Sequence, residues 1–357
     1  MDLKNIRWSE FIFEDVFNIN STNSGIDKNK LNNNKGDIPY ITRTDKSNGI
    51  DFFVGLQEEK FKIDKGNVIT IGLDTQTVFY QAHSFYTGQN IQILSSDFLN
   101  YFTSQFIIPL IKKQMEKFNW GGNGATLTRL KRSKILLPTT IEGKPDYDFM
   151  ELYMRHKENE KIQNFQKYII NRIEQIKHFK EVEPLNQKEC GEFEIGKLFK
   201  LFPGKSKGLN HLQKINAGIN YLGATNSNNG VLAFVSPEGN EKMIQKGNSI
   251  AFIRNGEGSM GFSIYKTEDF IATSDISVGY SEHLNREVGL FITTIADKIR
   301  GKYNFGYKRS DTRLKKEKLQ LPINEKGQPD YDYMANYIKK LEYEKLKKYI
   351  ERKTTKA

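Results

Sequence analysis

Short runs of apolar residues, separated by polar turns, follow the same order in the two halves of the chain. The strand-like runs of the first half and their matches in the second half are 38–44 with 219–225, 49–54 with 230–235, 65–71 with 246–252 and 85–91 with 270–276. Polar stretches at 45–48 and 226–229 connect the first two runs of each half, as turns between strands do. A stretch with helical spacing comes next, at 98–117 and at 284–302. The pattern predicts short strands and one internal helix in each half.

The ends of the two halves are nearly identical in sequence. Residues 128–150 contain Thr-Arg-Leu-Lys, then Leu-Pro, then Gly-Lys-Pro-Asp-Tyr-Asp-Phe-Met, and residues 312–334, 184 positions later, contain Thr-Arg-Leu-Lys, Leu-Pro and Gly-Gln-Pro-Asp-Tyr-Asp-Tyr-Met. In each copy a basic segment precedes a short strand, a Gly-x-Pro turn and an Asp-rich helix start. The chain is therefore a tandem duplication in which each copy ends in a helix.

The terminal helix of each copy has a narrow apolar stripe among many Lys and Glu residues. The residues that we expect to pair the two helices are Tyr153, Phe165, Ile169 and Ile173 in the first helix and Tyr337, Leu341 and Leu346 in the second. Two narrow stripes in one chain are most simply buried against each other, and the symmetry of the copies makes such a pair antiparallel. The alternative is that each stripe packs on its own domain.

These patterns predict an α+β protein with two copies of one domain, separated by long helices that pair as an antiparallel coiled coil. The predicted parts are a first domain at 1–145, a central spacer helix at 146–183, a second domain at 184–329 and a C-terminal spacer helix at 330–357. The 357 residues, 37% of them hydrophobic, are enough for a core in each copy.

The composition favours an anionic partner and a reducing compartment. The formal net charge is +11, for which nucleic acid is the usual partner, although a solubilising surface would also account for it. The single cysteine, Cys190, excludes an intramolecular disulfide framework and a multi-cysteine zinc site. The N-terminus lacks an apolar signal core, and the apolar run at 106–111 is too short to span a bilayer. We expect a soluble cytoplasmic protein.

Much of the positive charge lies in two matching segments. Residues 112–134 hold seven Lys or Arg against one acid, and residues 297–318 hold nine against three, so each segment has a net charge of +6. Aromatic residues, amides and glycines are interleaved at matching places, in Lys117-Phe118-Asn119-Trp120-Gly121 and in Lys302-Tyr303-Asn304-Phe305-Gly306. Solvated faces would explain the lysines alone. Nucleic acid explains the combination better, because Lys and Arg contact phosphates while Arg, Asn, Thr and Tyr on loops can reach base edges.

The candidate DNA-binding residues follow from this charge and from the turns. In the first copy they are Arg43, Thr44, Lys46, Asn48, Trp120, Asn123, Thr126, Thr128, Arg129, Lys131 and Arg132. In the second copy they are Asn226, Asn228, Arg254, Tyr303, Tyr307, Lys308, Arg309, Arg313, Lys315 and Lys316.

The order of these motifs, in both halves and over nearly the whole chain, resembles the DNA-specificity subunit of Type I restriction-modification systems and its relatives in Type IIB systems. The resemblance implies that each half is a target recognition domain for one half of a split DNA site. It also implies that the paired helices set the spacing and dock methyltransferase subunits, with a restriction subunit as a further partner. S-adenosylmethionine is then expected on the partner methyltransferase, and no cofactor on this chain.

No base contact can be transferred from that family, because its recognition domains diverge where they touch bases. The copies differ here too: Thr42-Arg43-Thr44-Asp45-Lys46 corresponds to Gly223-Ala224-Thr225-Asn226-Ser227. We therefore expect two different half-sites rather than a palindrome.

Catalytic interpretations fit the sequence less well. A DNA methyltransferase needs an Asn/Asp-Pro-Pro-Tyr/Phe motif, and the chain has no Pro-Pro dipeptide. A metal-dependent nuclease could use Asp146 with Glu158 and Lys161, or Asp330 with Glu342 and Lys345, but both aspartates stand where a helix needs a cap. The five histidines have no metal-ligand spacing, and the glycines at 121–124 lack the Gly-Lys-Ser/Thr ending of a phosphate-binding loop.

The sequence thus predicts a non-catalytic subunit, without catalytic or metal-binding residues, that directs methyltransferase and restriction subunits to a bipartite asymmetric DNA site. The alternatives are a nuclease or DNA-modification enzyme that acts alone, and an RNA-binding or structural helical scaffold.

Overall fold

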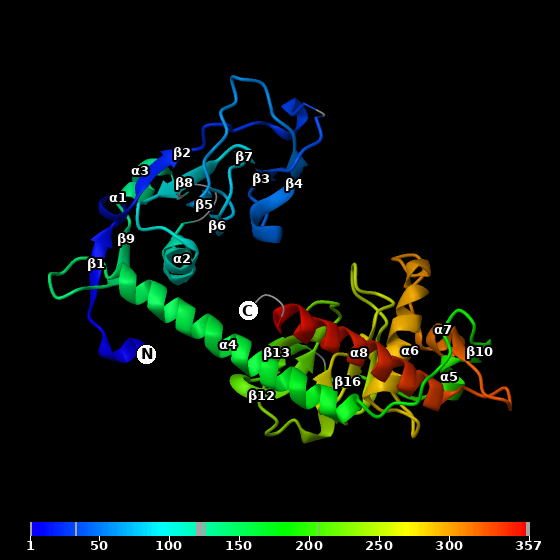
Figure 1. The fold of residues 1–357 in the computed structure, drawn as a ribbon. Helices are drawn as coiled ribbons and strands as arrows, with labels where there is room; N and C mark the ends of the chain where they lie inside the picture. Colours follow the sequence, from blue (N-terminus) through cyan, green and yellow to red (C-terminus); the bar gives the residue numbers. More distant parts are fainter. Residues whose placement is uncertain (1, 33, 119–123, 125, 207, 355–357) are drawn as a thin grey trace. The chain divides into compact units, whose positions relative to one another are not determined.

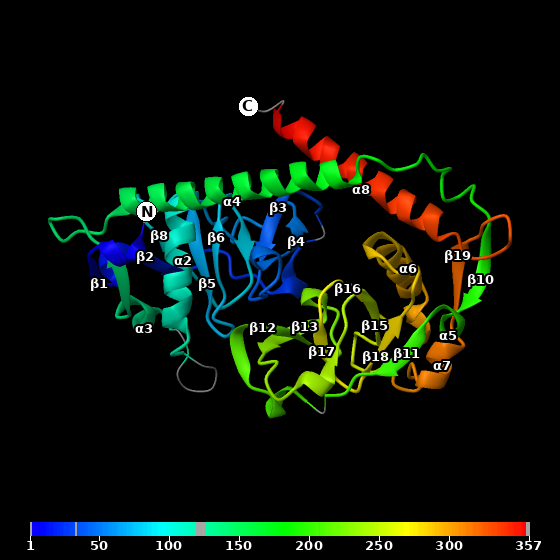
Figure 2. The same ribbon diagram turned by 90° about the horizontal axis from the view of Figure 1, so that it is seen from below.

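The computed structural model describes the chain except for residues 1, 33, 119–123, 125, 207 and 355–357. It forms two compact units, residues 1–165 (unit 1) and residues 166–357 (unit 2). Strands and helices follow one another in the same order in both units, except that unit 2 has an additional short strand at Ile244–Gln245; Figures 1 and 2 show the two units. The duplication predicted from the sequence is confirmed.

Unit 1 contains two main sheets and a two-stranded pairing of its first and last strands. Its elements are β1 (Trp8–Ile12), α1 (Phe13–Val16), β2 (Asn18–Ser21), β3 (Ile38–Ile41), β4 (Ile50–Val54), β5 (Val68–Gly72), β6 (Val78–Gln81), β7 (Tyr86–Thr87), β8 (Ile91–Ser95), α2 (Tyr101–Met115), α3 (Leu127–Lys131), β9 (Lys134–Pro138) and the start of α4 (Tyr147–Ile176). The sheets have the orders β2-β8-β5-β6, β4-β3-β7 and β1-β9.

Unit 2 repeats this plan. Its elements are β10 (Cys190–Glu194), α5 (Ile195–Leu198), β11 (Lys200–Pro203), β12 (Lys214–Leu222), β13 (Val231–Val235), β14 (Ile244–Gln245), β15 (Ser249–Ile253), β16 (Ser263–Lys266), β17 (Phe270–Ala272), β18 (Ile276–Tyr280), α6 (Arg286–Lys298), α7 (Asp311–Lys315), β19 (Lys318–Pro322) and α8 (Tyr331–Thr354). The sheets have the orders β11-β18-β15-β16, β13-β12-β17-β14 and β10-β19.

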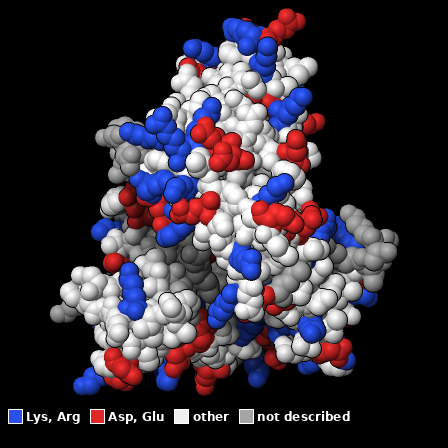
Figure 3. Space-filling model, turned by 90° about the vertical axis from the view of Figure 1, so that its left-hand side faces the viewer, with Lys and Arg blue, Asp and Glu red and all other residues white. Residues whose placement is uncertain are grey.

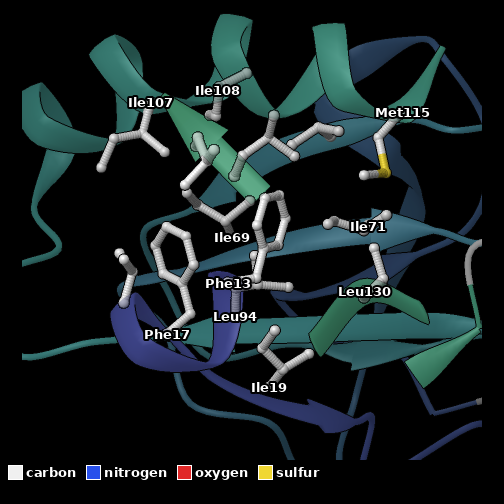
Figure 4. Packing of buried hydrophobic residues seen from close by; sticks show 14 of the residues in the cluster. Phe13, Phe17, Ile19, Ile69, Ile71, Leu94, Ile107, Ile108, Met115 and Leu130 are labelled. Atoms are coloured by element: carbon white, nitrogen blue, oxygen red, sulfur yellow. The ribbon is translucent and has the colours of Figure 1, made fainter. Parts of the chain in front are cut away.

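Each unit buries one face of an internal helix on its own sheet. In unit 1, Ile107 and Ile111 of α2 belong to one buried cluster with Ile69 and Ile71 of β5 and with Phe13, and Figure 4 shows side chains of this cluster closely packed between helix and sheet. In unit 2, residues of α6 and β15 form the corresponding cluster. All five residues of β5 and of β15 are buried, as expected for central strands. Burial of these apolar faces is the main source of stability in each unit.

The two long helices begin with matching caps. The Oδ1 atom of Asp146 accepts a hydrogen bond from the Phe149 amide at 2.9 Å, and Asp330 Oδ1 accepts one from the Tyr333 amide at the same distance. Each carboxylate thereby satisfies an otherwise unpaired N–H of the first turn. The capping role predicted for these aspartates is confirmed.

The last turns of α4 lie in unit 2 and meet α8, which runs in the opposite direction (Figure 2). Arg172 of α4 donates to Glu342 of α8 at 3.0 Å and to Glu287 of α6 at 2.6 Å. Burial alone would raise the pKa of Glu342, but hydrogen bonds from Arg172 and Arg286 lower it overall. The predicted antiparallel contact between the two long helices is therefore found at this ion cluster.

The residues predicted to pair the helices have different surroundings. Ile169 of α4 is fully buried, and Ile173 and Leu346 are half-buried, whereas Phe165 and Leu341 are more exposed. Tyr153 lies against Phe106 in the core of unit 1, with ring centroids 5.6 Å apart.

Tyr337 packs on its own unit as well, against Phe291 of α6 at 5.9 Å. The first turns of each long helix therefore pack on their own unit, and the contact between α4 and α8 involves the end of α4.

Candidate nucleic-acid interface

Unit 2 carries a basic hollow beside the short helix α7. Its volume is about 630 Å³, and Lys302, Arg313, Lys316 and Lys318 line it together with Tyr307. Ser310 caps α7, since its Oγ accepts a hydrogen bond from the Arg313 amide at 3.3 Å. Cationic and aromatic side chains around one concave surface can hold a phosphate backbone by charge and by hydrogen bonds.

Arg313 is well placed to contact a ligand in this hollow. Its guanidinium lies 3.8 Å from the centre of the Tyr307 ring, and its Nη1 donates to the Lys308 carbonyl at 2.8 Å. Both contacts hold an exposed side chain in one orientation, which lowers the entropy lost on binding. Lys308, Lys315 and Lys316 are also exposed around it.

Two residues predicted to contact DNA are instead part of the interior. Arg309 is fully buried, where its Nε donates to Glu317 at 3.1 Å and its Nη1 to the Gly261 carbonyl at 3.0 Å. Tyr303 is 9% exposed and donates its hydroxyl to Glu317. Burial, followed by this hydrogen bond, raises the pKa of Tyr303. The prediction for these two side chains is wrong, because their polar atoms are already used inside unit 2.

Arg254 is half-buried and serves mainly to hold loops together. Its Nη1 lies 3.1 Å from Asp311 at the start of α7, and its Nη2 donates to the Ser274 carbonyl. Asp311 also accepts from Ser277 of β18 at 2.9 Å. Arg254 therefore connects α7 to the loops at the ends of β15 and β17.

Unit 1 places its basic residues on the matching helix α3. Arg129 and the C-cap residue Arg132 are exposed, Lys131 at the last position of the helix is half-buried, and Thr126 and Thr128 lie at its start. Arg129 Nη1 donates to the Gly124 carbonyl at 3.0 Å, which parallels the bond from Arg313 to Lys308. The predictions for Trp120 and Asn123 lie outside the described residues.

The predicted hairpin loops reach the surface in both units. In unit 1, Lys46 and Asn48 are exposed, and in unit 2, Asn226 and Asn228 are at the matching turn. The turns contain Asn48 and Asn229 in the left-handed backbone region, at φ of 58° and 53°. Asn48 donates its side-chain amide to the Tyr80 carbonyl at 2.9 Å, so that amide helps to shape the loop.

Basic and acidic side chains occur together on the surface. On the face in Figure 3, Lys and Arg side chains are mixed with Asp and Glu side chains. Many of the basic residues are paired, such as Lys134 with Glu10 and Lys318 with Glu192, both at 2.9 Å. Paired charges contribute little to attraction of a polyanion, so Lys134 and, in the hollow beside α7, Lys318 are weaker binding candidates.

Three of the residues considered for a nuclease centre have other partners. Asp146 and Asp330 cap helices, Asp330 also pairs with Lys188 at 3.0 Å, and Glu342 belongs to the Arg172 cluster. Among the residues that the structure describes, no group of three or more His, Cys, Asp or Glu side chains could hold a metal ion. In the same part of the chain no helix is long and apolar enough to cross a membrane.

Sequence reasoning missed one set of polar residues at the strand ends. Asp74 follows β5, Asn90 precedes β8, and Asn255 and Asp275 occupy the matching places in unit 2. Each pair is joined by a side-chain hydrogen bond, from Asn90 to Asp74 at 3.4 Å and from Asn255 to Asp275 at 3.1 Å. Alignment of the two copies against each other could have found these positions.

Comparisons with known proteins find similar proteins both by sequence and by structure. The sequence model of the family "Type I restriction modification DNA specificity domain" matches residues 5–167 and 187–352. The specificity subunit of the Type II restriction enzyme BcgI from Heyndrickxia coagulans is 29% identical over 341 residues, which are 94% of this chain and 95% of that protein. The crystal structure of a Type I restriction-modification S subunit from M. genitalium matches with a TM-score of 0.53 and 15% identity, covering 99% of this chain and 94% of that one.

Proposed function

The chain belongs to the Type I restriction modification DNA specificity domain family and is a specificity subunit of a restriction-modification system, and we propose that its two units read two different halves of one bipartite DNA site. The observation that carries the proposal is the pair of matching basic helices, α3 and α7. Each begins with Thr or Ser at the cap and holds an Arg side chain by a carbonyl in the same way. Duplicated faces with different neighbouring loops fit two half-sites of different sequence.

Phosphate contacts would come from the cations of α3 and α7, and base contacts from the hairpin loops of the two units. The hairpin loops 42–48 and 223–229 have similar backbones but different side chains. Similar backbones place both units on DNA in the same way, while different side chains present different donors and acceptors to the bases.

The chemistry would be performed by partner subunits. We propose that this chain directs DNA methyltransferase subunits, which bind S-adenosylmethionine, and a restriction activity to the site, and that it binds no cofactor itself. The relative from Heyndrickxia coagulans is named as a subunit of a Type II restriction enzyme, which favours partners of that type. Since duplex DNA and these subunits are its partners, we place its action in the cytoplasm.

Selection from a library of DNA duplexes with randomised bases and gap lengths tests the bipartite site. The purified full-length chain, alone and with its co-purified partners, should enrich two conserved blocks of different sequence at a fixed distance. Enrichment of one continuous motif, of a palindrome, or of no motif would contradict the proposal.

A second expectation is that the purified chain alone neither methylates nor cleaves DNA. Methyl transfer from labelled S-adenosylmethionine should appear only when the partner subunits are added. Turnover by the pure chain with a divalent metal, abolished by Glu158→Gln or Glu342→Gln without unfolding, would instead support a catalyst within it.

Charge removal on either basic helix should weaken DNA binding and its dependence on salt. We expect Arg129→Ala and Arg313→Ala each to reduce the slope of log affinity against log salt by about one, because one phosphate contact is lost. Lys326→Ala removes an equal charge at an exposed turn outside α7 and serves as the control. Unchanged slopes in both helix variants would mean that these arginines do not touch DNA.

A further inference from the structure

The ends of the central strands have the same backbone arrangement in both units. The Leu73 amide donates to the Asn90 carbonyl at 3.0 Å in unit 1, and the Arg254 amide donates to the Asp275 carbonyl at 2.8 Å in unit 2. Residues after β5 therefore correspond one to one with residues after β15, and residues before β8 with residues before β18.

At these matching positions the two units carry the same two residue types, Asp and Asn, in exchanged order. The residue after the central strand is Asp74 in unit 1 and Asn255 in unit 2, whereas the residue before the neighbouring strand is Asn90 in unit 1 and Asp275 in unit 2. An amide donates to a carboxylate in both, but the carboxylate has changed strands. The exchange keeps the hydrogen bond but moves the carboxylate from one strand end to the other, so the two units present different donors and acceptors at this place.

In unit 1 an arginine contacts this Asp–Asn pair, and the matching position in unit 2 is an alanine. Arg43, from the loop between β3 and β4, donates through Nη1 to Asp74, and its side chain is 42% exposed. The matching residue in unit 2 is Ala224, as the bonds from Thr42 to Gly49 and from Gly223 to Gly230 show. The arginine next to this place in unit 2 is Arg254, whose Nη atoms are held by Asp311 and Ser274.

The surroundings of Arg43 hold it in one orientation. Its stem passes Gly72, where an added Cβ would lie 3.4 Å from the Arg43 Cγ, so the stem is in van der Waals range of this part of the backbone. Asp74 fixes the Nη1 end of the guanidinium. The opposite edge of the guanidinium, formed by Nε and Nη2, carries two parallel donors.

We propose that Arg43 reads a guanine in the half-site of unit 1, with Asp74 as the residue that positions it. This inference rests on the proposed DNA-reading function. The Nε–Nη2 edge of the guanidinium matches the two acceptors, O6 and N7, that guanine presents in the major groove, and no other base presents two acceptors there. The charge of Arg43 is already compensated by Asp74, so it is a poorer phosphate ligand than Lys46 in the same loop but a well-ordered base reader. Ala224 cannot make this contact, so unit 2 reads its half-site differently.

The test uses the full-length chain and the preferred DNA site from selection. Binding is measured to that site and to every single-base change in both half-sites. Wild-type protein should require guanine at one position of one half-site, and Arg43→Ala and Arg43→Lys should each reduce discrimination at that position by about 5- to 150-fold. Discrimination at all other positions, and throughout the other half-site, should stay the same. The lysine variant keeps the charge, so its binding to unrelated DNA should stay near the wild-type level.

Two further variants distinguish base reading by Arg43 from phosphate binding by Lys46 and from the positioning role of Asp74. Lys46→Ala, the matched control in the same loop, should weaken binding to all sequences alike. Asp74→Asn keeps the size of the side chain but removes its charge. It should reduce discrimination at the guanine position while binding to unrelated DNA becomes stronger and more salt-dependent, because Arg43 is then uncompensated.

Several results would overturn this inference without affecting the proposed function. The first is a bipartite site with no required guanine in the half-site of unit 1. The second is a set of folded Arg43 variants whose affinity falls by the same factor for every sequence. The third is a set of Arg43 variants that bind as the wild type does. Absence of any bipartite preference in the wild-type protein would be a failure of the proposed function itself. Circular dichroism of each variant confirms that the fold is kept.

Discussion

Replacement of Arg309 by alanine should lower the free energy of unfolding of unit 2 by about 3–5 kcal/mol, the usual cost of removing one partner from a buried ion pair. Both side chains of the pair are fully buried, and Arg309 also donates to two backbone carbonyls. Its removal leaves the Glu317 carboxylate in the interior with only the Tyr303 hydroxyl and the more distant Lys302 nearby. Hydrogen exchange followed by mass spectrometry would measure the loss separately for each unit.

Unit 1 provides the internal control for this variant. Residues Ala125 and Ser133 stand where unit 2 has Arg309 and Glu317, and Phe118 stands where it has Tyr303. Exchange protection of unit 1 should therefore not change. The double variant Arg309→Met with Glu317→Leu removes both charges and should restore most of the stability, because an apolar pair avoids the cost of burying ions. Equal destabilisation by the single and the double variant would mean that packing, not charge, holds this region.

Insertion of four helical residues after Asn164 in α4 should change the distance between the two half-sites that the protein prefers. Four residues lengthen a helix by about 6 Å at ~1.5 Å per residue, which is roughly two base pairs at ~3.4 Å each. The insertion turns the helix by about 40° beyond a full turn, whereas two base pairs turn DNA by about 70°. The added length should make a longer gap the preferred one, so the original site loses most of its affinity. The rotational mismatch of about 30° should weaken binding to the new preferred site as well.

Gap preference is measured by selection from duplexes with both half-sites fixed and the gap randomised. The same four residues inserted into the exposed turn at 141–144, before α4 begins, should leave the preferred gap unchanged. A folded α4 insertion variant that keeps the original gap would show that helix length does not determine it. A change in the bases read, rather than in the gap, would also contradict the prediction.

The architecture could be predicted because nearly every element occurs twice. A single short apolar run such as 68–72 is ambiguous between strand and helix, but the matching run at 249–253, between matching turns, removes the ambiguity. The helix caps were predictable for a local reason, since Asp146 and Asp330 act on amides three residues away. Local hydrogen bonds and repeated patterns can be recognised in a sequence.

The errors came from contacts that a linear pattern does not contain. Arg309 looked like its exposed neighbour Lys308 because the two are adjacent in a basic run. Only the fold brings Arg309 to Glu317 and to the Gly261 carbonyl, 48 residues away. Tyr153 and Tyr337 continue apolar stripes at helical spacing, but the stripe alone does not indicate which surface covers each turn. The long-range partner decides whether a residue is structural or available to bind.

The pairing of the first and last strands has a consequence for how the chain can be rearranged. Trp8 of β1 lies opposite Pro138 of β9, and Cys190 of β10 lies opposite Pro322 of β19, so each repeat brings its own beginning and end together. A polypeptide whose termini meet can be opened at another exposed loop and rejoined at the old ends with little loss of stability. Circular permutation therefore keeps every strand pairing described within each repeat, and so does division of the gene between the repeats into two cistrons. The folds of the repeats do not dictate the order in which the ribosome makes them.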